Sequence, residues 1–247
     1  MAASGRYRWV RGPPSRTGPP SSRACVPASE PTDRAARLRQ QLAFIVEVDR
    51  LKLVLRRTTT ADGSRHENSA EHSWHLALGA LALAEHAEPG TDITRVIRMV
   101  LVHDLVEIDA GDTFAYDQAA NVGRVAREVI AADRLFGMLP LEQASGLRAL
   151  WEEFEEGRTP TARFAIALDR LLPLLLNDAA AGGSWRAHGV ARSQVIRRMA
   201  PIETAVPALW PLVIEIVDRN CALGHIGADA IETGLPAGSP EKLSSAQ

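Results

Sequence analysis

The sequence predicts an all-α protein built as one helical domain, and three observations support this fold class. Hydrophobic residues make up 46% of the chain and charged residues 23%, as is usual for a globular protein. Aromatic residues contribute only 5%, and the apolar remainder is mostly Ala, Leu, Val and Ile, a composition that favours helices over a β-sandwich. Apolar positions recur at helical spacing, whereas no alternating run is long enough to predict a strand.

Each predicted helix follows from an apolar period combined with local start and stop signals. The first rests on the spacing of residues such as Leu38 and Leu42. Ser69 is the predicted N-cap of the second helix, and Asp92 or Thr91 can cap the third. In chain order we predict helices over the ranges 34–55, 69–86, 92–108, 122–136, 141–154, 160–181, 193–199 and 202–222.

The predicted domain covers residues 34–228 and lies between two segments of different composition. Residues 1–33 are rich in Pro and Arg and contain only two acids, Glu30 and Asp33. Such a segment buries too little apolar surface to offset its ordering entropy, so we expect a disordered basic leader. It lacks the amphipathic repeat of a transit peptide, which favours an idle tail or a misplaced start codon. Residues 229–247 are rich in Gly, Ser and Pro and predict a flexible C-terminal tail.

Charge and cysteine content exclude several classes of function. The net charge of −2 argues against a nucleic-acid partner, because surfaces that follow a phosphate backbone are strongly basic. Two cysteines, Cys25 and Cys221, are too few for a disulfide framework or a Cys-based zinc site, so we expect a cytoplasmic location. No run of 18 apolar residues is free of charge, and we expect no membrane span.

The dipeptide His103-Asp104 is the first candidate for chemistry. It follows the apolar residues 100–102, which we expect to be buried, and Glu107 and Asp112 come shortly after it. Taken alone, such a dipeptide is more often a core histidine beside a solvated aspartate. With two further acids nearby, the cost of buried charge calls for a partner, and a divalent cation supplies one because it takes both carboxylate and imidazole as ligands.

Two other predicted helices carry residues of the same kind. His72 lies near the start of the helix predicted over 69–86, three residues before His75. Asp169 lies inside the strongly apolar helix predicted over 160–181, where an aspartate is rarely buried without a partner. A local ion pair with Arg170 or Arg163 is the structural alternative for Asp169.

Read in chain order, these residues give the pattern His, His-Asp, Asp on three predicted helices. This order resembles the HD superfamily of metal-dependent phosphohydrolases. Three motifs are similar to the branch that contains bacterial 5′-deoxynucleotidases and their eukaryotic relatives: Glu71-His72, the His-Asp-x-x-Glu from His103 to Glu107, and Gly111-Asp112. The resemblance covers about residues 38–176 and implies a single-domain helical bundle of the HD type.

The resemblance implies one metal held by His72, His103, Asp104 and Asp169. Two imidazoles and two carboxylates suit Mn²⁺, Co²⁺, Fe²⁺, Ni²⁺ or Zn²⁺ better than Mg²⁺. The implied activity is the removal of phosphate from a small molecule by a metal-activated water, with a (deoxy)nucleoside 5′-monophosphate as the expected substrate. Asp104, as a ligand, and Glu107, as the residue that orients or deprotonates the water or protonates the leaving oxygen, are the predicted catalytic residues.

The resemblance also implies substrate contacts. Arg56 corresponds to the phosphate-contacting arginine, Asp112 is expected near the sugar, and Arg65 is a second candidate for phosphate contact. The chain departs from the family at residue 57, where Arg57 stands in place of the Trp that follows this arginine in the deoxynucleotidases. Relatives in this branch form homodimers, so we expect a homodimer by resemblance.

Other readings of the same residues remain open. A diiron oxygenase of this superfamily needs further histidines before the final aspartate, and residues 105–168 contain none. Alarmone hydrolases usually have Asp directly after the motif Glu, whereas Ile108 separates Glu107 from Asp109 here. Phosphodiester hydrolysis is a further alternative. A scaffold domain without turnover is disfavoured because every expected ligand is present.

Overall fold

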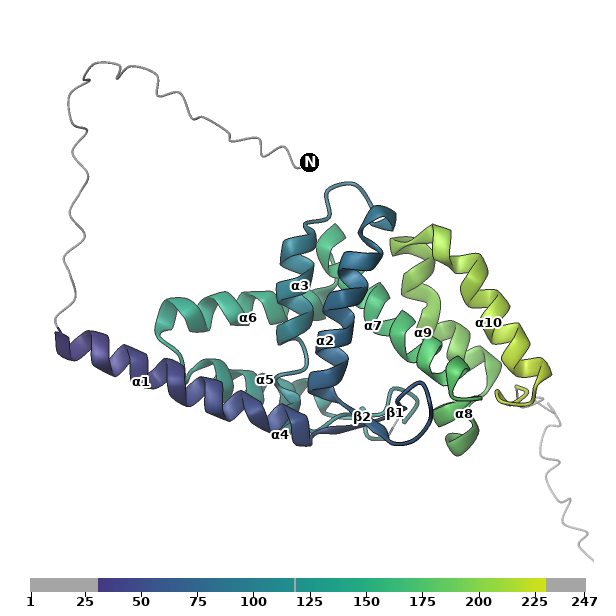
Figure 1. Ribbon diagram of the computed structural model, residues 1–247, viewed down its shortest axis with the longest axis horizontal. Coiled ribbons are helices and arrows are strands. Elements are labelled where there is room, and N and C mark those ends of the chain that lie inside the picture. The colour runs from purple at the N-terminus through teal and green to yellow at the C-terminus, as the bar shows by residue number, and fades with distance from the viewer. Residues whose placement is uncertain (1–30, 118, 230–247) are drawn as a thin grey trace, which may run out of the picture.

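The chain folds into packed α-helices with one small β-hairpin, and α2, α3 and α7 lie near its centre (Figure 1). This computed structural model describes residues 31–117 and 119–229. The predicted all-α fold class is confirmed. The elements are α1 (Pro31–Val48), η1 (Asp49–Leu53), β1 (Leu55–Thr59), β2 (His66–Asn68), α2 (Ser69–Ala82), η2 (Ala84–His86), α3 (Ile93–Val102), α4 (Glu107–Ala110), α5 (Arg124–Phe136), α6 (Leu141–Glu156), α7 (Pro160–Ala179), α8 (Gly183–His188), α9 (Arg192–Ala205), η3 (Pro207–Leu209) and α10 (Trp210–Ala222), where η marks a 3₁₀-helix.

Helix α7 is the centre of the larger hydrophobic cluster. Its side chains Phe164 and Leu168 are fully buried, and the helix packs against α2, α3 and α9. Thr159 caps its N-terminus by accepting a hydrogen bond from the backbone N–H of Ala162 at 3.0 Å. Because α7 is apolar around most of its circumference, it is a core helix rather than a surface helix. Asp169, in the middle of α7, is therefore held inside the protein.

A second hydrophobic cluster supports the segment between α3 and α4. Leu105 and Val106, which directly follow His103-Asp104, are buried with Leu135 of α5 and Leu150 of α6. Burying a leucine side chain contributes about 1.5–3 kcal/mol relative to exposing it. The turn that carries the His-Asp pair is thus anchored by apolar packing on its C-terminal side.

The β-hairpin corrects the expectation that the first helix runs to Leu55 and that no strand forms. Helix α1 ends at Val48, and after η1 the backbone extends into β1, which pairs antiparallel with β2. Leu55 pairs with Asn68 in this register. The connecting loop closes through a hydrogen bond from Gly63 N–H to Thr60 O at 2.8 Å. The run of threonines at 58–60 favours the extended backbone, and a three-residue strand is too short for an alternating pattern to reveal.

Helix α3 also ends earlier than predicted, at Val102 rather than near Ile108. Asp92 caps its start as expected, accepting from Arg95 N–H at 3.0 Å. At its end the imidazole Nδ1 of His103 bonds to the carbonyl oxygen of Val100 at 2.8 Å, and the following amides bond three residues back rather than four. His103 and Glu107 therefore flank a tight turn and do not lie on one continuous helix, as the predicted range 92–108 had implied.

The C-terminal helices divide at a different residue from the one predicted. Helix α9 continues through Pro201 to Ala205, whereas the sequence predicted a break after Met199. The break falls at Val206, whose backbone is extended with φ −143° because Pro207 follows it. Helix α10 begins only at Trp210.

The predicted terminal segments lie mostly outside the described residues. This holds for residues 1–30 of the leader and 230–247 of the tail, while residues 31–33 belong to α1 and so correct the predicted start of the domain. No helix in the described ranges is long and apolar enough to cross a membrane.

Candidate metal centre

His72 is fixed at the start of α2 by a capping box. Asn68 is the N-cap, in place of the predicted Ser69, and its side-chain oxygen accepts from Glu71 N–H at 2.9 Å. The Glu71 carboxylate accepts from Asn68 N–H at 3.2 Å in return. Both bonds define the first turn of α2, from which His72 points into the interior with no exposed surface.

His103 and Asp104 lie on the turn between α3 and α4. The bond from His103 Nδ1 to Val100 O assigns a proton to Nδ1 and makes Nε2 the nitrogen that faces the cluster and is available to a metal. Nε2 lies 3.0 Å from Asp104 Oδ1, yet it is buried and makes no hydrogen bond of acceptable geometry. The imidazole is therefore oriented from behind, with its reactive nitrogen turned toward the carboxylate.

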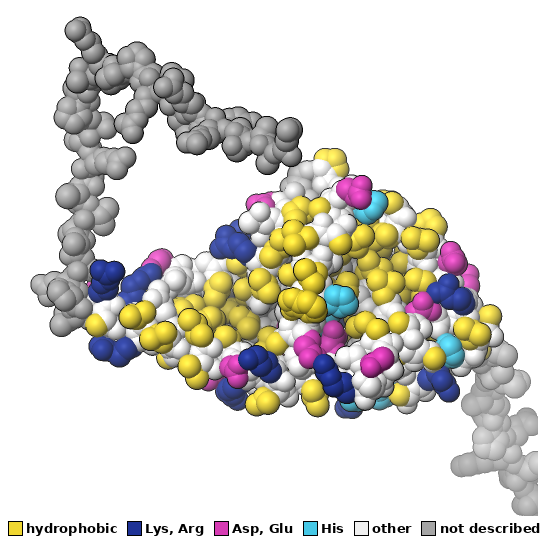
Figure 2. Space-filling model, in the orientation of Figure 1, with side chains coloured by type: hydrophobic (Ala, Val, Ile, Leu, Met, Phe, Trp, Pro, Cys, Tyr) yellow, Lys and Arg dark blue, Asp and Glu magenta, His cyan; other side chains and the backbone are white. Residues whose placement is uncertain are grey.

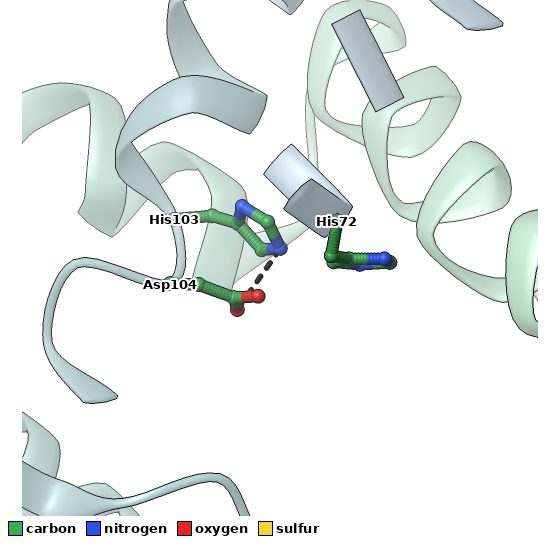
Figure 3. Close-up of side chains that lie close together, drawn as sticks. All are labelled: His72, His103 and Asp104. Carbon is green, nitrogen blue, oxygen red and sulfur yellow. Dashed lines mark ion pairs between the residues drawn. The ribbon is translucent and has the colours of Figure 1, made fainter. Parts of the chain in front are cut away.

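Asp169 of α7 completes the cluster. Its Oδ1 lies 2.9 Å from His72 Nε2 and 3.8 Å from His103 Nε2. His72, His103 and Asp104 offer ligand atoms that all lie within 4.8 Å of one another, and Figure 3 shows the three side chains close together. The four side chains predicted as metal ligands from three separate segments therefore come together at one point.

The charges of this cluster depend on one another. Burial lowers the pKa of His103, but Asp104 and Asp169 outweigh this effect and raise it to about 10. Burial raises the pKa of Asp104, whereas His103 and Arg56 outweigh it and hold it at about 2. The pKa of Asp169 is held well below its ordinary value because Arg170 and both histidines outweigh its burial. Two ionised carboxylates thus face two imidazoles, and all four side chains are buried.

These donors fit a divalent cation. In the absence of a cation, a second proton on His103 offsets only part of the negative charge of Asp104 and Asp169, and His103 Nε2 has no hydrogen-bond partner among the described residues. A cation bound by His103 Nε2, His72 Nε2 and the two aspartates would neutralise the same charge and use the unpaired nitrogen. The mixed nitrogen and oxygen set is the one that first-row transition metals prefer.

Arg56 reaches the cluster from strand β1. Its Nη1 donates to Asp104 Oδ2 at 2.8 Å and lies 3.8 Å from Asp112 Oδ1. Asp112 follows α4 directly, after Gly111, whose φ of +76° is a conformation that favours glycine. Burial lowers the pKa of Arg56, but Asp104, Glu107 and Asp112 outweigh it and raise that pKa, so the guanidinium is charged.

Glu107 is the first residue of α4 and is buried beside the cluster. It accepts a hydrogen bond from the Ser69 hydroxyl at 2.6 Å. Burial, together with the neighbouring Asp104 carboxylate, raises its pKa well above the ordinary value. A carboxyl group with a raised pKa is a stronger base than a free glutamate once it is ionised, which is the direction that a general base requires.

Arg65 does not join this group. Its guanidinium donates two hydrogen bonds of 2.8 Å to the Glu71 carboxylate, and its side chain is 55% exposed. It lies just before β2, on the outer side of the capping box, and is absent from the walls of the cavity that the cluster lines. The structure thus separates the two arginines that the sequence placed together as phosphate contacts.

Three charged side chains at the site were not singled out in the sequence. Glu67 of β2 is buried against His72 and Arg56. Arg170, which we considered in the sequence only as a local partner of Asp169, forms an ion pair with that aspartate. Nη2 of Arg198, in α9, lies 3.8 Å from Asp169 Oδ2. Arg170 follows a predicted ligand directly, which is a usable signal, whereas Arg198 is one of several arginines in a surface-like stretch and only the packing of α9 on α7 brings it in.

The cluster opens into a cavity of about 220 Å³, which His103, Asp104, Glu107 and Asp169 line together. A second cavity shares Arg56, Asp112, Asp169, Arg170 and Arg198 with it. This cavity extends between Phe114 and Tyr116, from the loop after α4, and Trp185 of α8. The site therefore has a charged chamber and an adjoining aromatic chamber.

Comparison with known proteins identifies the family. The HD-domain family model matches residues 48–210, which include every element of the cluster. The chain belongs to the HD-domain family. A crystal structure described as a predicted metal-dependent phosphohydrolase from Magnetospirillum magnetotacticum MS-1 is similar, with 48% identity, a TM-score of 0.74, and coverage of 78% of this chain and 99% of that chain. The resemblance inferred from the motifs is thus confirmed.

More distant relatives carry a more specific name. The 5′-deoxynucleotidase HDDC2 of Xenopus laevis is 33% identical over 104 residues, which are 42% of this HD-domain chain and 50% of the relative. The human 5′-deoxynucleotidase HDDC2 is 29% identical over 133 residues, or 53% of this chain and 64% of the relative. The chain thus matches between half and two thirds of the length of these curated relatives.

Proposed function

We propose that this HD-domain protein is a metal-dependent phosphohydrolase that removes phosphate from a (deoxy)nucleoside 5′-monophosphate. The observation that carries the proposal is the convergence of His72, His103, Asp104 and Asp169 beside Arg56, at the wall of one cavity. The similarity to a structure described as a metal-dependent phosphohydrolase supports the class of reaction. The relatives named 5′-deoxynucleotidase support the class of substrate.

Three guanidinium groups support a phosphate ester as the substrate. Arg56, Arg170 and Arg198 all line the cavity, each next to a carboxylate of the cluster. Guanidinium donors match the oxygens of a phosphate group in geometry and charge. A divalent cation bound at the cluster would add two positive charges beside these arginines. A phosphomonoester dianion balances them better than a phosphodiester, which carries one charge.

The cation, when bound, polarises the phosphoryl group and lowers the pKa of a coordinated water. His72, His103 and Asp169 would hold it together with Asp104, and their mixed donors favour Mn²⁺, Co²⁺, Fe²⁺, Ni²⁺ or Zn²⁺ over Mg²⁺. Arg56 orients the phosphate against Asp104. The burial of all four ligands excludes bulk water and so strengthens each of these electrostatic contacts.

Glu107 moves the proton. Its carboxylate takes a proton from the attacking water at one oxygen, while the Ser69 hydroxyl holds Oε2 in place. The protonated carboxyl group then returns the proton to the leaving ester oxygen. The raised pKa of Glu107 favours the first step, because it makes the carboxylate a stronger base than a free glutamate.

The leaving group of the substrate has a fitting place in the aromatic chamber. Phe114 and Tyr116 pack edge to face with ring centroids 5.3 Å apart, and Trp185 lies beside them. Planar nucleobases stack well on aromatic walls. Arg57, which occupies the position of the family tryptophan, also lines this chamber and changes how it receives the base. Asp112, which lines both chambers, can accept a hydrogen bond from the sugar.

Phosphate release tests the proposal. We expect metal-stripped protein to release phosphate from nucleoside 5′-monophosphates only after Mn²⁺ or Co²⁺ is restored. Asp104→Ala should lower this rate by about a thousandfold or more, because it removes both a ligand and the partner of Arg56. Ribo- and deoxyribonucleotides assayed in parallel show whether the 2′-hydroxyl matters. If no monophosphate is hydrolysed while metal stays bound, the nucleotidase assignment is wrong, and phosphodiesters and alarmones become the next substrates to assay.

The homodimer and the cytoplasmic location stay proposals. Figure 2 shows hydrophobic side chains gathered along α1 and over α2, and these include Leu42, Ile45 and Val46 of α1 and Trp74 of α2, all more than half exposed. A contiguous apolar surface of this kind is typical of a protein interface, and a second copy of the chain would cover it. Light scattering that gives the mass of one chain would contradict the dimer.

A further inference from the structure

Glu67 is a buried acid that neither the metal cluster nor the phosphate contacts account for. It lies in β2, one residue before the Asn68 cap, and is only 4% exposed. Burying a carboxylate without hydrogen-bond partners costs free energy of folding, so such a group in a native protein calls for an explanation. The side chains around Glu67 indicate its role.

One oxygen of Glu67 lies between the two halves of the site. Oε2 is 3.5 Å from Nδ1 of His72 and 3.7 Å from Nε of Arg56. All three atoms are buried and have no hydrogen-bond partner among the described residues. Three unpartnered polar atoms thus converge on one point, and two of them belong to a metal ligand and to the phosphate-binding arginine.

The tautomer of His72 explains why the contact is long. His72 Nε2 lies 2.9 Å from Asp169 Oδ1, so in the metal-free protein Nε2 carries the proton that makes this hydrogen bond. Nδ1 then presents a lone pair to the Glu67 carboxylate, and the two acceptors repel each other. When Nε2 becomes a metal ligand it must lose that proton, and a neutral ring then carries its proton on Nδ1. Glu67 Oε2 is the acceptor placed to receive that N–H.

The same oxygen also faces Arg56. A guanidinium has five N–H donors in a rigid plane, and Arg56 uses Nη1 on Asp104 while Nε points toward Glu67. A carboxylate at Nε fixes the rotation of this plane and therefore the direction in which the remaining donors meet a phosphate.

We propose that Glu67 is a positioning residue that orients the metal ligand His72 and the phosphate-binding Arg56 through one shared oxygen. The inference rests on the proposed function in taking His72 as a metal ligand and Arg56 as a phosphate contact. It adds that metal binding and phosphate binding are coupled through the second strand of the hairpin.

Calorimetric titration of the metal-free protein with Mn²⁺ tests whether Glu67 orients His72. Glu67→Gln keeps the shape of the side chain and removes its charge. We expect the dissociation constant for Mn²⁺ to rise by about ten- to a hundredfold, as is usual when the carboxylate behind a ligating histidine is lost. Titration with inorganic phosphate at saturating Mn²⁺ tests whether Glu67 also orients Arg56, and there we expect affinity to fall about threefold or more.

Glu71→Gln is the matched control. It neutralises the next acid along the chain, which is bound to Arg65 outside the cavity. The glutamine amide oxygen can still accept the capping bond from Asn68 N–H, so both affinities should stay within about twofold of the parent. The unfolding temperature of the metal-free protein, measured for both variants, separates positioning from stability. Positioning predicts that Glu67→Gln changes mainly the rise in this temperature on adding Mn²⁺, because the hydrogen bond from His72 Nδ1 to Glu67 forms only in the metal-bound tautomer.

Several results would overturn the proposal. If Glu67→Gln leaves the Mn²⁺ affinity unchanged, Glu67 does not orient His72. If it leaves the phosphate affinity unchanged, Glu67 does not couple His72 to Arg56. A metal-free unfolding temperature that falls enough to explain the whole loss assigns Glu67 a structural role instead. Because both titrations need no turnover, a protein that binds Mn²⁺ and phosphate but hydrolyses no nucleotide would fail the proposed function while these results still decide the role of Glu67.

Discussion

The two ends of the β-hairpin carry two arginines in very different surroundings. Arg56 in β1 is 11% exposed at its side chain and faces Asp104, Asp112 and Glu67, all of them at the cavity or buried beside it. Arg65, just before β2, is 55% exposed and pairs with Glu71 alone. Both arginines had been expected to contact phosphate. The hairpin therefore has an inner end that belongs to the site and an outer end that belongs to the surface.

Hydrogen-bond geometry alone does not show which of the two ion pairs is stronger, because the pairs differ in burial. The pair of Arg65 with Glu71 has two hydrogen bonds of 2.8 Å, whereas Arg56 makes one of 2.8 Å to Asp104. Solvent screens the outer pair, so its better geometry contributes little. The inner pair is desolvated, and removing one partner leaves a buried charge uncompensated. The contacts of Arg56 with Asp104, Asp112 and Glu67, which we call the inner network, are thus strong because they are buried.

The largest effect that we expect near the inner network is on Glu107. Glu107→Gln removes the proton carrier and keeps the size of the side chain, so kcat/KM for the monophosphate that the parent hydrolyses best should fall about a hundred- to ten-thousandfold. Mn²⁺ affinity should stay close to that of the parent, because Glu107 is not among the proposed ligands. A fall in activity that matches a loss of metal would instead make Glu107 a ligand.

The raised pKa of Glu107 also predicts how stability changes with pH. A carboxyl group whose folded pKa is raised holds its proton more tightly in the folded state, so its contribution to stability is full at low pH. That contribution declines as pH rises above the unfolded value of 4.5 toward the folded pKa. Glutamine mimics the protonated form at every pH. Denaturant titrations of the metal-free proteins should therefore show Glu107→Gln gaining stability over the parent between pH 4 and pH 7, and a constant difference would contradict the shift.

A smaller effect is expected when Arg56 keeps its charge but loses its planar fork. Arg56→Lys still offers a cation to Asp104, yet it cannot donate to the phosphate and to Glu67 from one rigid plane. We expect kcat/KM to fall about ten- to a hundredfold while Mn²⁺ affinity changes little. Equal activity in Arg56→Lys would show that the charge alone matters and that the inner end of the hairpin has no geometric role.

The sequence predicted the inner residues better than the backbone that carries them. His72, His103, Asp104 and Asp169 could be selected because buried charges in apolar helices need a partner and because their order matches a family motif. The turn at His103 could not be foreseen, since it depends on an imidazole bonding to Val100 O in place of a helical amide. The hairpin was missed because β2 has only three residues.

Long-range contacts explain what else the sequence left out. In the sequence, nothing distinguishes Glu67 from the other polar residues around it. Only the pairing of β1 with β2 places it next to His72. Arg198 joins the site only because α9 packs on α7. Arg65 was selected because it is an arginine close in sequence to the Glu71-His72 motif. Residue type and sequence distance do not show on which side of the hairpin a side chain lies. Burial, which separates Arg56 from Arg65, is a property of the packed structure.

The smallest effect is expected at the outer end, and it tests the comparison most directly. Arg65→Ala removes both hydrogen bonds to Glu71, but the capping bonds between Glu71 and Asn68 do not involve the guanidinium. Activity should therefore stay within about twofold of the parent. Any loss of stability should shrink as salt rises from about 0.01 M to 1 M, because counter-ions screen the parent's exposed pair and not the inner one. A drop in kcat/KM comparable with that of Arg56→Lys would place Arg65 on the substrate, and the hairpin would then have two functional ends.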